Sequence, residues 1–327
     1  MPPDIANTTA PARLYSLLLK LRPVEYGTLM AFSGEMVHAA FLHWVQTEAP
    51  DVAEWLHDGN KRRLFTCSSL QFPLPSARMR DAEFKNTHLP LFPEKMYTVR
   101  LTLLMGELFP LLYHTLLRFN GSSATTREPF MRLGKQEFHL QEVVMTDDAS
   151  GWSGSHSLSA LVEQAQARPL GNAASLTLEF ASLTSFNRST LQNKAYGKYF
   201  ALLPLPQYIF PMLALRWREL APPELASLVQ AEQIERYIQD DGMIISDYNL
   251  RPHHVTFTNH PQKGFVGTCT YQLRGPDATP DSTVTPLTVR QQLLLLAHFA
   301  FYSGVGYKTP MGLGQVRMLG GTGNDRV

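Results

Sequence analysis

Apolar residues recur at two different spacings along the first sixty residues, and each spacing predicts one kind of element. Within 14–22, the residues Tyr15, Leu17, Leu19 and Leu21 share one face at a period of two, which predicts a strand. Over 37–45 the apolar residues follow helical spacing, and Ser33 stands where a side chain can cap the first turn. Pro50 then begins a second predicted helix, which Gly59 ends.

The rest of the first half continues the series. Strand patterns occupy 64–72 and 97–104, and we expect a long polar loop between them. A helical pattern follows over 106–121, and a final strand over 138–146. The predicted order is therefore βαββαβ, that of a ferredoxin-like unit.

The second half repeats this order after a stretch rich in Gly, Ser and Ala at 149–174. Helices are predicted at 205–220, 222–238 and 289–303, and strands at 176–180, 243–258, 263–273 and 312–319. Thr288 and Gln291 have the spacing of a capping box for the last helix. We therefore predict an α+β fold of tandem ferredoxin-like (RRM-like, βαββαβ) domains over 1–150 and 151–327, with a C-terminal glycine-rich loop.

Composition agrees with a bilobed globular protein that we expect in the cytoplasm. The chain has 327 residues, 44% hydrophobic and 17% charged, which suits two domains. The N-terminal apolar run lacks the features of a signal peptide, and the apolar run 293–302 is half of a bilayer span. Cys67 and Cys269 form no CxxC pair, which argues against a zinc knuckle and a disulfide scaffold; we expect Cys67 to be an ordinary buried strand residue.

The net charge of +1 does not by itself indicate a nucleic-acid-binding protein. However, four stretches lack acidic residues and contain several Lys and Arg, namely 59–80, 181–218, 248–276 and 282–324. Such stretches can form local basic surfaces for phosphates. The alternative, that these charges are scattered over solvated faces, stays open.

The most specific motif is the segment GVGYKTPMGLGQVRML at 304–319. Its glycines lie between a helix and a terminal strand, the reverse of the strand-to-helix order of a dinucleotide-binding turn. Residues without side chains let backbone amides approach a phosphate, and Lys308 adds charge. The segment thus favours binding to a phosphate backbone.

With this loop, the chain resembles over nearly its whole length the CRISPR-associated endoribonuclease family six of the RAMP superfamily. The resemblance also covers 178–187, 203–217 and 264–273, and the order of elements in both halves. It implies cleavage of CRISPR repeat RNA by attack of a ribose 2′-hydroxyl on the adjacent phosphate, giving a 2′,3′-cyclic phosphate and mature guide RNA, with no metal or cofactor. Such chemistry needs a group that moves a proton near neutral pH and cations that stabilise the phosphorane.

The resemblance also implies the catalytic residues. In the family a histidine often ends the helical stretch before the second strand, with a basic residue a few positions later, and His57 and Arg63 hold these places here. Lys61 and Arg62 are alternatives to Arg63. His38 is the main rival of His57, because many relatives carry a histidine early in the first helix.

One position departs from the family pattern. The tyrosine that some members carry on the first helix falls near Leu42, so His38, His43 and Tyr26 are candidates for its role. The residues expected to bind RNA are Lys61, Arg62, Arg188, Lys194, Lys198, Arg251, Gly304, Gly306, Tyr307, Lys308, Gly312 and Gly314. We expect no metal site, since His38 and His43 do not share a helix face and the pairs Asp147–Asp148 and Asp240–Asp241 have the character of turns or caps.

Three functions remain open from the sequence. The first is a metal-independent endoribonuclease with CRISPR repeat RNA as its partner. The second is a non-catalytic RAMP subunit that binds RNA in an effector complex, and the third is a structural protein. Effector subunits and a second copy of the chain are further candidate partners, and no membrane partner is expected.

Overall fold

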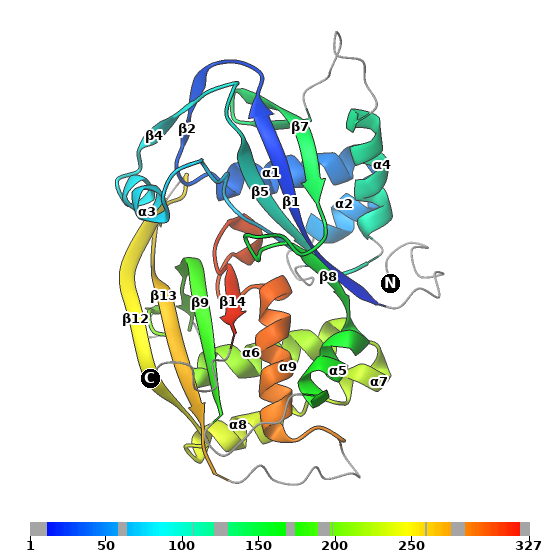
Figure 1. The fold of residues 1–327 in the computed structure, drawn as a ribbon, viewed down its shortest axis with the longest axis vertical. Helices are drawn as coiled ribbons and strands as arrows, with labels where there is room; N and C mark the ends of the chain where they lie inside the picture. Colours follow the sequence, from blue (N-terminus) through cyan, green and yellow to red (C-terminus); the bar gives the residue numbers. More distant parts are fainter. Residues whose placement is uncertain are drawn as a thin grey trace. The chain divides into compact units, whose positions relative to one another are not determined.

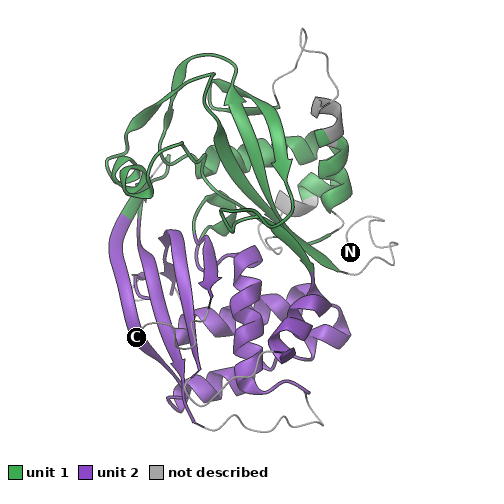
Figure 2. Ribbon diagram, viewed as in Figure 1, with its two compact units in different colours: residues 1–156, 254–262, 308–313 green, residues 157–253, 263–307, 314–327 purple. Residues whose placement is uncertain are grey.

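The computed structural model describes residues 12–57, 64–106, 108–120, 130–167, 174–188, 197, 199–258, 260–275 and 285–320. The chain forms two compact units, shown in Figure 2. Unit 1 comprises residues 1–156, 254–262 and 308–313, and unit 2 comprises residues 157–253, 263–307 and 314–327. Two short segments from late in the sequence therefore belong to the unit formed by the N-terminal half.

Unit 1 is built on an antiparallel sheet with β1 at its centre (Figure 1). The strand order β3-β5-β1-β7-β6 comprises β3 (Phe65–Cys67), β5 (Tyr97–Leu103), β1 (Arg13–Pro23), β7 (Gln136–Val144) and β6 (Met131–Leu133), and β8 (Gly154–Ser157) also pairs with β1. Helices α1 (Gly34–Glu48) and α2 (Pro50–His57) lie between β1 and β3 in sequence, and α4 (Leu108–Asn120) lies between β5 and β7. The order of the main strands, second-third-first-fourth, confirms the first predicted ferredoxin-like unit.

Burial explains why these segments form a sheet and a helical layer. Leu17, Leu19 and Leu21 of β1 are at most 1% exposed, and each such side chain contributes about 1.5–3 kcal/mol to folding. On α1, Val37, Phe41 and Trp44 form the buried stripe that helical spacing predicted. The Trp44 indole also donates a hydrogen bond to the carbonyl of Phe130 at 3.1 Å.

Unit 2 has the same strand order. Its sheet runs β12 (Met243–Thr256), β13 (Pro261–Leu273), β9 (Ser175–Thr184), β14 (Val316–Leu319). Helix α6 (Pro206–Leu220) follows β9, and α9 (Val289–Ser303) follows β13. These elements again form a split βαβ pair, so the tandem ferredoxin-like fold is confirmed.

Helix α9 confirms the predicted capping box. Thr288 and Gln291 form the capping box, with Thr288 Oγ1 accepting from the Gln291 amide and Gln291 Oε1 accepting from the Thr288 amide. Its apolar run is a buried core helix, since Leu293, Leu294, Leu295 and Leu296 are all 0% exposed. Within the described residues, the helices lack the combination of length and apolar character needed to span a bilayer.

Regular structure occurs in the predicted polar loop and in the Gly/Ser/Ala-rich stretch 149–174, for which no element was predicted. The expected polar loop contains α3 (Ser76–Phe84), which buries only Met79 and Ala82, and β4 (His88–Leu91), which pairs with β2 (Gly27–Met30) in a separate ribbon. The stretch 149–174 contains β8 and α5 (Leu158–Ala167). A small apolar stripe was overlooked in each because Gly, Ser and charged residues surround it.

Two predicted boundaries were also wrong. The expected helix 222–238 is broken into α7 (Pro223–Ala226) and α8 (Ala231–Gln239), because Gln230 is extended and its amide bonds the side chain of Gln292. The expected strand 64–72 is regular only over β3. Beyond it, the amide of Leu70 bonds Ser33 Oγ at 2.9 Å, and pairing with β5 resumes as a single bridge between Gln71 and Thr98.

Candidate active site

The first turn of α1 is held by the chain that follows β3. Ser33 lies at the N-cap position, but its hydroxyl makes no capping bond and instead accepts from the Leu70 amide. The Ser33 amide in turn donates to Ser69 Oγ at 3.3 Å. The predicted capping role of Ser33 was therefore wrong, since this side chain ties the helix start to the end of β3.

The segment 308–313 belongs to unit 1 and packs against the same helix start. It contains the short helix η3 (Thr309–Met311), flanked by Lys308 and Gly312 in the left-handed region at φ 53° and 89°. A Cβ on Gly34 would lie 2.2 Å from the Met311 carbonyl oxygen, and one on Gly312 would lie 3.1 Å from the Gly34 Cα. The two backbones approach this closely only because both positions are glycine.

His38 lies one turn further along α1 and is oriented by this segment. Its Nδ1 atom lies 3.1 Å from the carbonyl oxygen of Pro310. Because a carbonyl only accepts, Nδ1 carries the hydrogen, and Nε2 is the ring nitrogen that gains or loses a proton. The half-buried ring also stacks on Phe65 of β3, with centroids 5.5 Å apart and planes 16° from parallel.

Cys67 of β3 binds the same carbonyl. Its Sγ atom lies 2.7 Å from the oxygen of Pro310, and the side chain is fully buried. Burial raises the pKa of the thiol well above its usual range, although a hydrogen bond from the Gly312 amide acts to lower it. The predicted buried strand cysteine is confirmed, but it also has a specific polar contact that the sequence did not indicate.

A third part of unit 1 reaches the start of α1. Glu35 Oε2 accepts hydrogen bonds from the amide and hydroxyl of Thr258, at 2.8 and 3.0 Å. The ammonium of Lys308 lies 3.7 Å from the centre of the Phe257 ring, a cation–π contact. The helix start is thus packed by segments more than two hundred residues later in the sequence.

Two family models match the chain. The model of the CRISPR Cas6 N-terminal domain matches residues 13–163, and that of the CRISPR-associated endoribonuclease Cas6 matches residues 178–316. The chain belongs to the Cas6 family. It is therefore an endoribonuclease-family protein of the CRISPR system, as the resemblance implied, and its tandem ferredoxin-like fold agrees with this assignment.

Solved Cas6 structures share its fold. A Cas6 product complex is 24% identical, with a TM-score of 0.67, and the match covers 94% of this chain and 100% of that one. A second Cas6 product complex is 22% identical with a TM-score of 0.63 and the same coverage. Cas6 of Thermus thermophilus is 22% identical with a TM-score of 0.59, covering 95% and 100%. No curated protein sequence matches the chain significantly.

Only part of the predicted Cas6 catalytic set can be located. His57 is the last residue of α2, but its side chain is not described, and Lys61, Arg62 and Arg63 lie outside the described residues. The roles of these four residues therefore stay predictions. Among the candidates for proton transfer, His38 is held by contacts from distant segments, whereas the side chains of His43 and Tyr26 are exposed.

The predicted RNA-binding residues of unit 2 include two exposed arginines. Arg188 follows β10 (Phe186–Asn187), and its guanidinium lies 4.7 Å from the centre of the Tyr208 ring. Arg251 lies on the exposed part of β12. Lys194 and Lys198 lie outside the described residues, so contacts between these four side chains and RNA stay predictions.

The glycines of the loop that belong to unit 2 also have a packing role. A Cβ on Gly306 would lie 2.5 Å from the carbonyl oxygen of Ser185, which accepts from the Tyr307 amide. The Gly314 amide donates to the Leu183 carbonyl, and the Gly304 amide to that of Ala300. These amides complete the fold of unit 2, and the predicted phosphate contacts of the loop stay untested.

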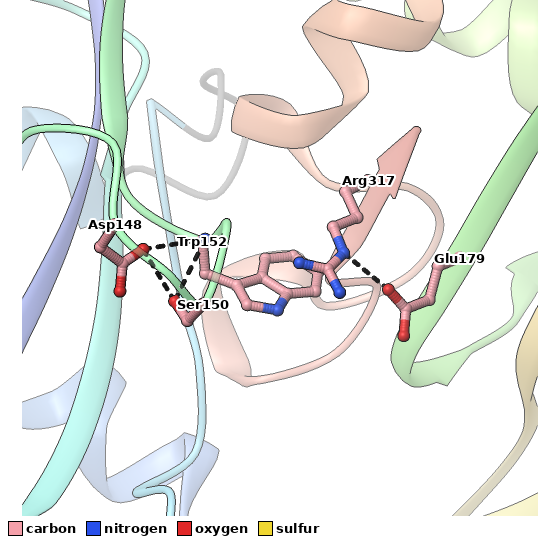
Figure 3. Close-up of polar contacts among 5 residues, drawn as sticks. All are labelled: Asp148, Ser150, Trp152, Glu179 and Arg317. Carbon is pink, nitrogen blue, oxygen red and sulfur yellow. Dashed lines mark hydrogen bonds and ion pairs between the residues drawn. The ribbon is translucent and has the colours of Figure 1, made fainter. Parts of the chain in front are cut away.

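The predicted turn role of Asp148 is confirmed (Figure 3). Desolvation acts to raise its pKa, but hydrogen bonds from Ser150, Ser153 and backbone amides outweigh it and lower the pKa to about 2. Asp240 and Asp241 are also turn residues, at the C-terminal end of α8. Within the described residues, no three His, Cys, Asp or Glu side chains group closely enough to hold a metal ion.

Unit 2 contains an ion pair that the sequence did not indicate. Arg317 Nε of β14 lies 2.6 Å from Glu179 Oε2 of β9, with both side chains about three-tenths exposed (Figure 3). The pair is directly opposite in the strand register. Its partial burial and single short contact suit a stabilising link between these two strands.

Proposed function

We propose that this chain cleaves CRISPR repeat RNA without a metal ion, and that His38 transfers the proton. In this reaction the 2′-oxygen forms a bond to phosphorus while the bond from phosphorus to the 5′-oxygen breaks. Nε2 of His38 accepts the proton of the 2′-hydroxyl and, once protonated, delivers a proton to the 5′-oxygen. The products are a 2′,3′-cyclic phosphate and a 5′-hydroxyl.

The observation that supports His38 is the hydrogen bond from Nδ1 to the Pro310 carbonyl. This bond persists in both the neutral and the protonated ring, because Nδ1 carries a hydrogen in both. Nε2 is therefore the nitrogen that gains and loses a proton, and stacking on Phe65 limits the orientation of the ring plane. A fixed ring of this kind is what general acid–base catalysis requires.

The descriptions of solved Cas6 structures are a further reason to test a histidine as the residue that transfers the proton. One Cas6 structure, 21% identical, is of a variant in which a histidine is replaced by alanine, and another is of a substrate-mimic complex. The phosphorane also needs positive charge, for which Arg63, Lys61, Arg62 and Lys308 are the candidates in this chain. Arg188 and Arg251 are proposed to bind the RNA backbone.

Replacing His38 by alanine should lower the single-turnover cleavage rate by about 10²–10⁴-fold, because general acid–base catalysis contributes roughly that much. RNA affinity should change little, since one imidazole near the cut contributes little to backbone binding. His43→Ala is the matched comparison: His43 was also a candidate for proton transfer and lies on the same helix with its side chain exposed, and our proposal gives the role to His38 instead. It should cleave at the wild-type rate.

His57→Ala, measured in parallel, tests the rival assignment. Loss of cleavage in His57→Ala with normal cleavage in His38→Ala would overturn the role of His38 and leave the reaction in place. Binding of repeat RNA by the wild-type protein without any cut would instead support the non-catalytic RNA-binding subunit.

A further inference from the structure

One backbone carbonyl joins a buried thiol to the proposed catalytic ring. The oxygen of Pro310 accepts from Cys67 Sγ at 2.7 Å and from His38 Nδ1 at 3.1 Å. A carbonyl oxygen has two lone pairs, so both bonds can exist together. Pro310 itself has no amide hydrogen, which leaves its carbonyl as the polar backbone group that ties this residue to α1 and β3.

The chemical state of Cys67 suits it to a donor role. Burial raises the pKa of the thiol, so at neutral pH the sulfur keeps its hydrogen and can donate it. The Gly312 amide donates to the same sulfur. Cys67 therefore contacts the segment 308–313 at two points, while β3 holds the cysteine itself within the sheet.

We propose that Cys67 is a positioning residue for His38, holding the Pro310 carbonyl at the place where it fixes the imidazole. This inference rests on the proposed function of His38. Cys67 would not touch the RNA, and its effect would pass through one carbonyl oxygen.

Loss of the thiol should therefore affect catalysis more than binding. In Cys67→Ala the Pro310 carbonyl loses its bond to the sheet, so the oxygen is held less firmly and its hydrogen bond with Nδ1 of His38 weakens. Small misplacements of a catalytic group are costly, and we expect a cleavage rate about tenfold lower. In Cys67→Ser a hydroxyl donor replaces the thiol at nearly the same place, and most of the rate should return.

Thr309→Val provides a matched control in the same segment. Thr309 is fully buried next to Pro310, and its hydroxyl has no hydrogen-bond partner among the described residues. Valine keeps its shape and removes only this hydroxyl, so the change should be tolerated. This control separates loss of the Cys67 bond from any general disturbance of the segment.

The experiment measures single-turnover cleavage and repeat-RNA affinity for the three variants, and the ¹⁵N shifts of the His38 ring in the RNA-free protein. We expect Cys67→Ala alone to lower the rate at unchanged affinity, and to reduce the share of the Nδ1–H form of the neutral ring. A wild-type rate in Cys67→Ala, no rescue by Cys67→Ser, or an equal loss in Thr309→Val would overturn the proposal.

The ring signals also separate this proposal from the proposed function. Unchanged ¹⁵N shifts in Cys67→Ala would overturn the positioning role even if His38 is catalytic. Normal cleavage by His38→Ala would instead overturn the proposed function, and the ring signals would still report whether Cys67 fixes the imidazole.

Discussion

Single side chains in this protein are held by hydrogen bonds to backbone groups from distant parts of the sequence. His38 and Cys67 both bind the carbonyl of Pro310, and Arg100 Nε donates to Ser16 Oγ and to the Trp152 carbonyl. Each bond satisfies a polar group that would otherwise be costly to bury. The position of a functional residue here thus depends on chain segments that its own neighbourhood in sequence does not reveal.

Asp148 gives a prediction at this scale. Its folded-state pKa of about 2 lies below the ordinary value of about 3.9, so its contribution to stability is present above about pH 4 and is lost as the pH falls toward 2. After allowance for solvent screening, Asp148→Asn should lower the free energy of unfolding at pH 7 by roughly 1 kcal/mol. Denaturant unfolding from pH 7 to pH 2 should show this difference shrinking.

Asp147→Asn is the control, since it removes the same charge from the exposed neighbouring side chain. An Asp148→Asn deficit that stays constant down to pH 2 would contradict the account of this turn.

At the scale of elements, the helix α1 begins at a close approach of two glycines. A side chain at Gly34 would collide with the Met311 carbonyl, although alanine is ordinarily the better helix former by roughly 0.5–1 kcal/mol. The collision involves backbone atoms, which cannot rotate away. Steric cost should therefore exceed the gain in helix propensity.

Gly34→Ala should lower the thermal midpoint of unfolding by several degrees and reduce cleavage as segment 308–313 is displaced. Gly320→Ala should leave both unchanged, because no described residue has an atom within 4 Å of a Cβ at that position. The test is to measure the thermal midpoint of unfolding and the cleavage rate of both variants. A Gly34→Ala protein as stable and active as wild type would contradict this, because it would mean that a Cβ at position 34 does not collide with the Met311 carbonyl.

Elements with strong periodicity could be predicted from the sequence, and elements defined by tertiary partners could not. The alternation in β1 and the capping box of α9 were sufficient to place those elements. Helix α3 buries only two residues, and β3 ends at Cys67, shortly before the Leu70 amide bonds Ser33, so neither has a local signal for its bounds.

The candidate active site also depends on tertiary partners that the sequence does not indicate. His38 was a candidate from the resemblance, but its contact with Pro310 spans 272 positions, and no local pattern encodes such a distance. Cys67 was recognised as buried from its strand, while its bond to the same carbonyl was missed. The packing role of Gly34 has no sequence signal beyond the residue itself.

At the scale of the whole molecule, two units of the same strand order are combined in one chain of the Cas6 family. The formal charge of +1 is low for an RNA-binding protein. RNA binding should therefore depend on local basic stretches rather than on overall charge. In the proposed reaction, the RNA supplies its own nucleophile, the ribose 2′-hydroxyl next to the phosphate that is cut.

The most direct test is cleavage of the repeat RNA in EDTA, with and without a single 2′-deoxy substitution at the cut site. The account predicts one cut in EDTA, a 2′,3′-cyclic phosphate on the upstream fragment, and no cut in the deoxy RNA. A cut that requires magnesium, or one that proceeds normally in the deoxy RNA, would contradict it.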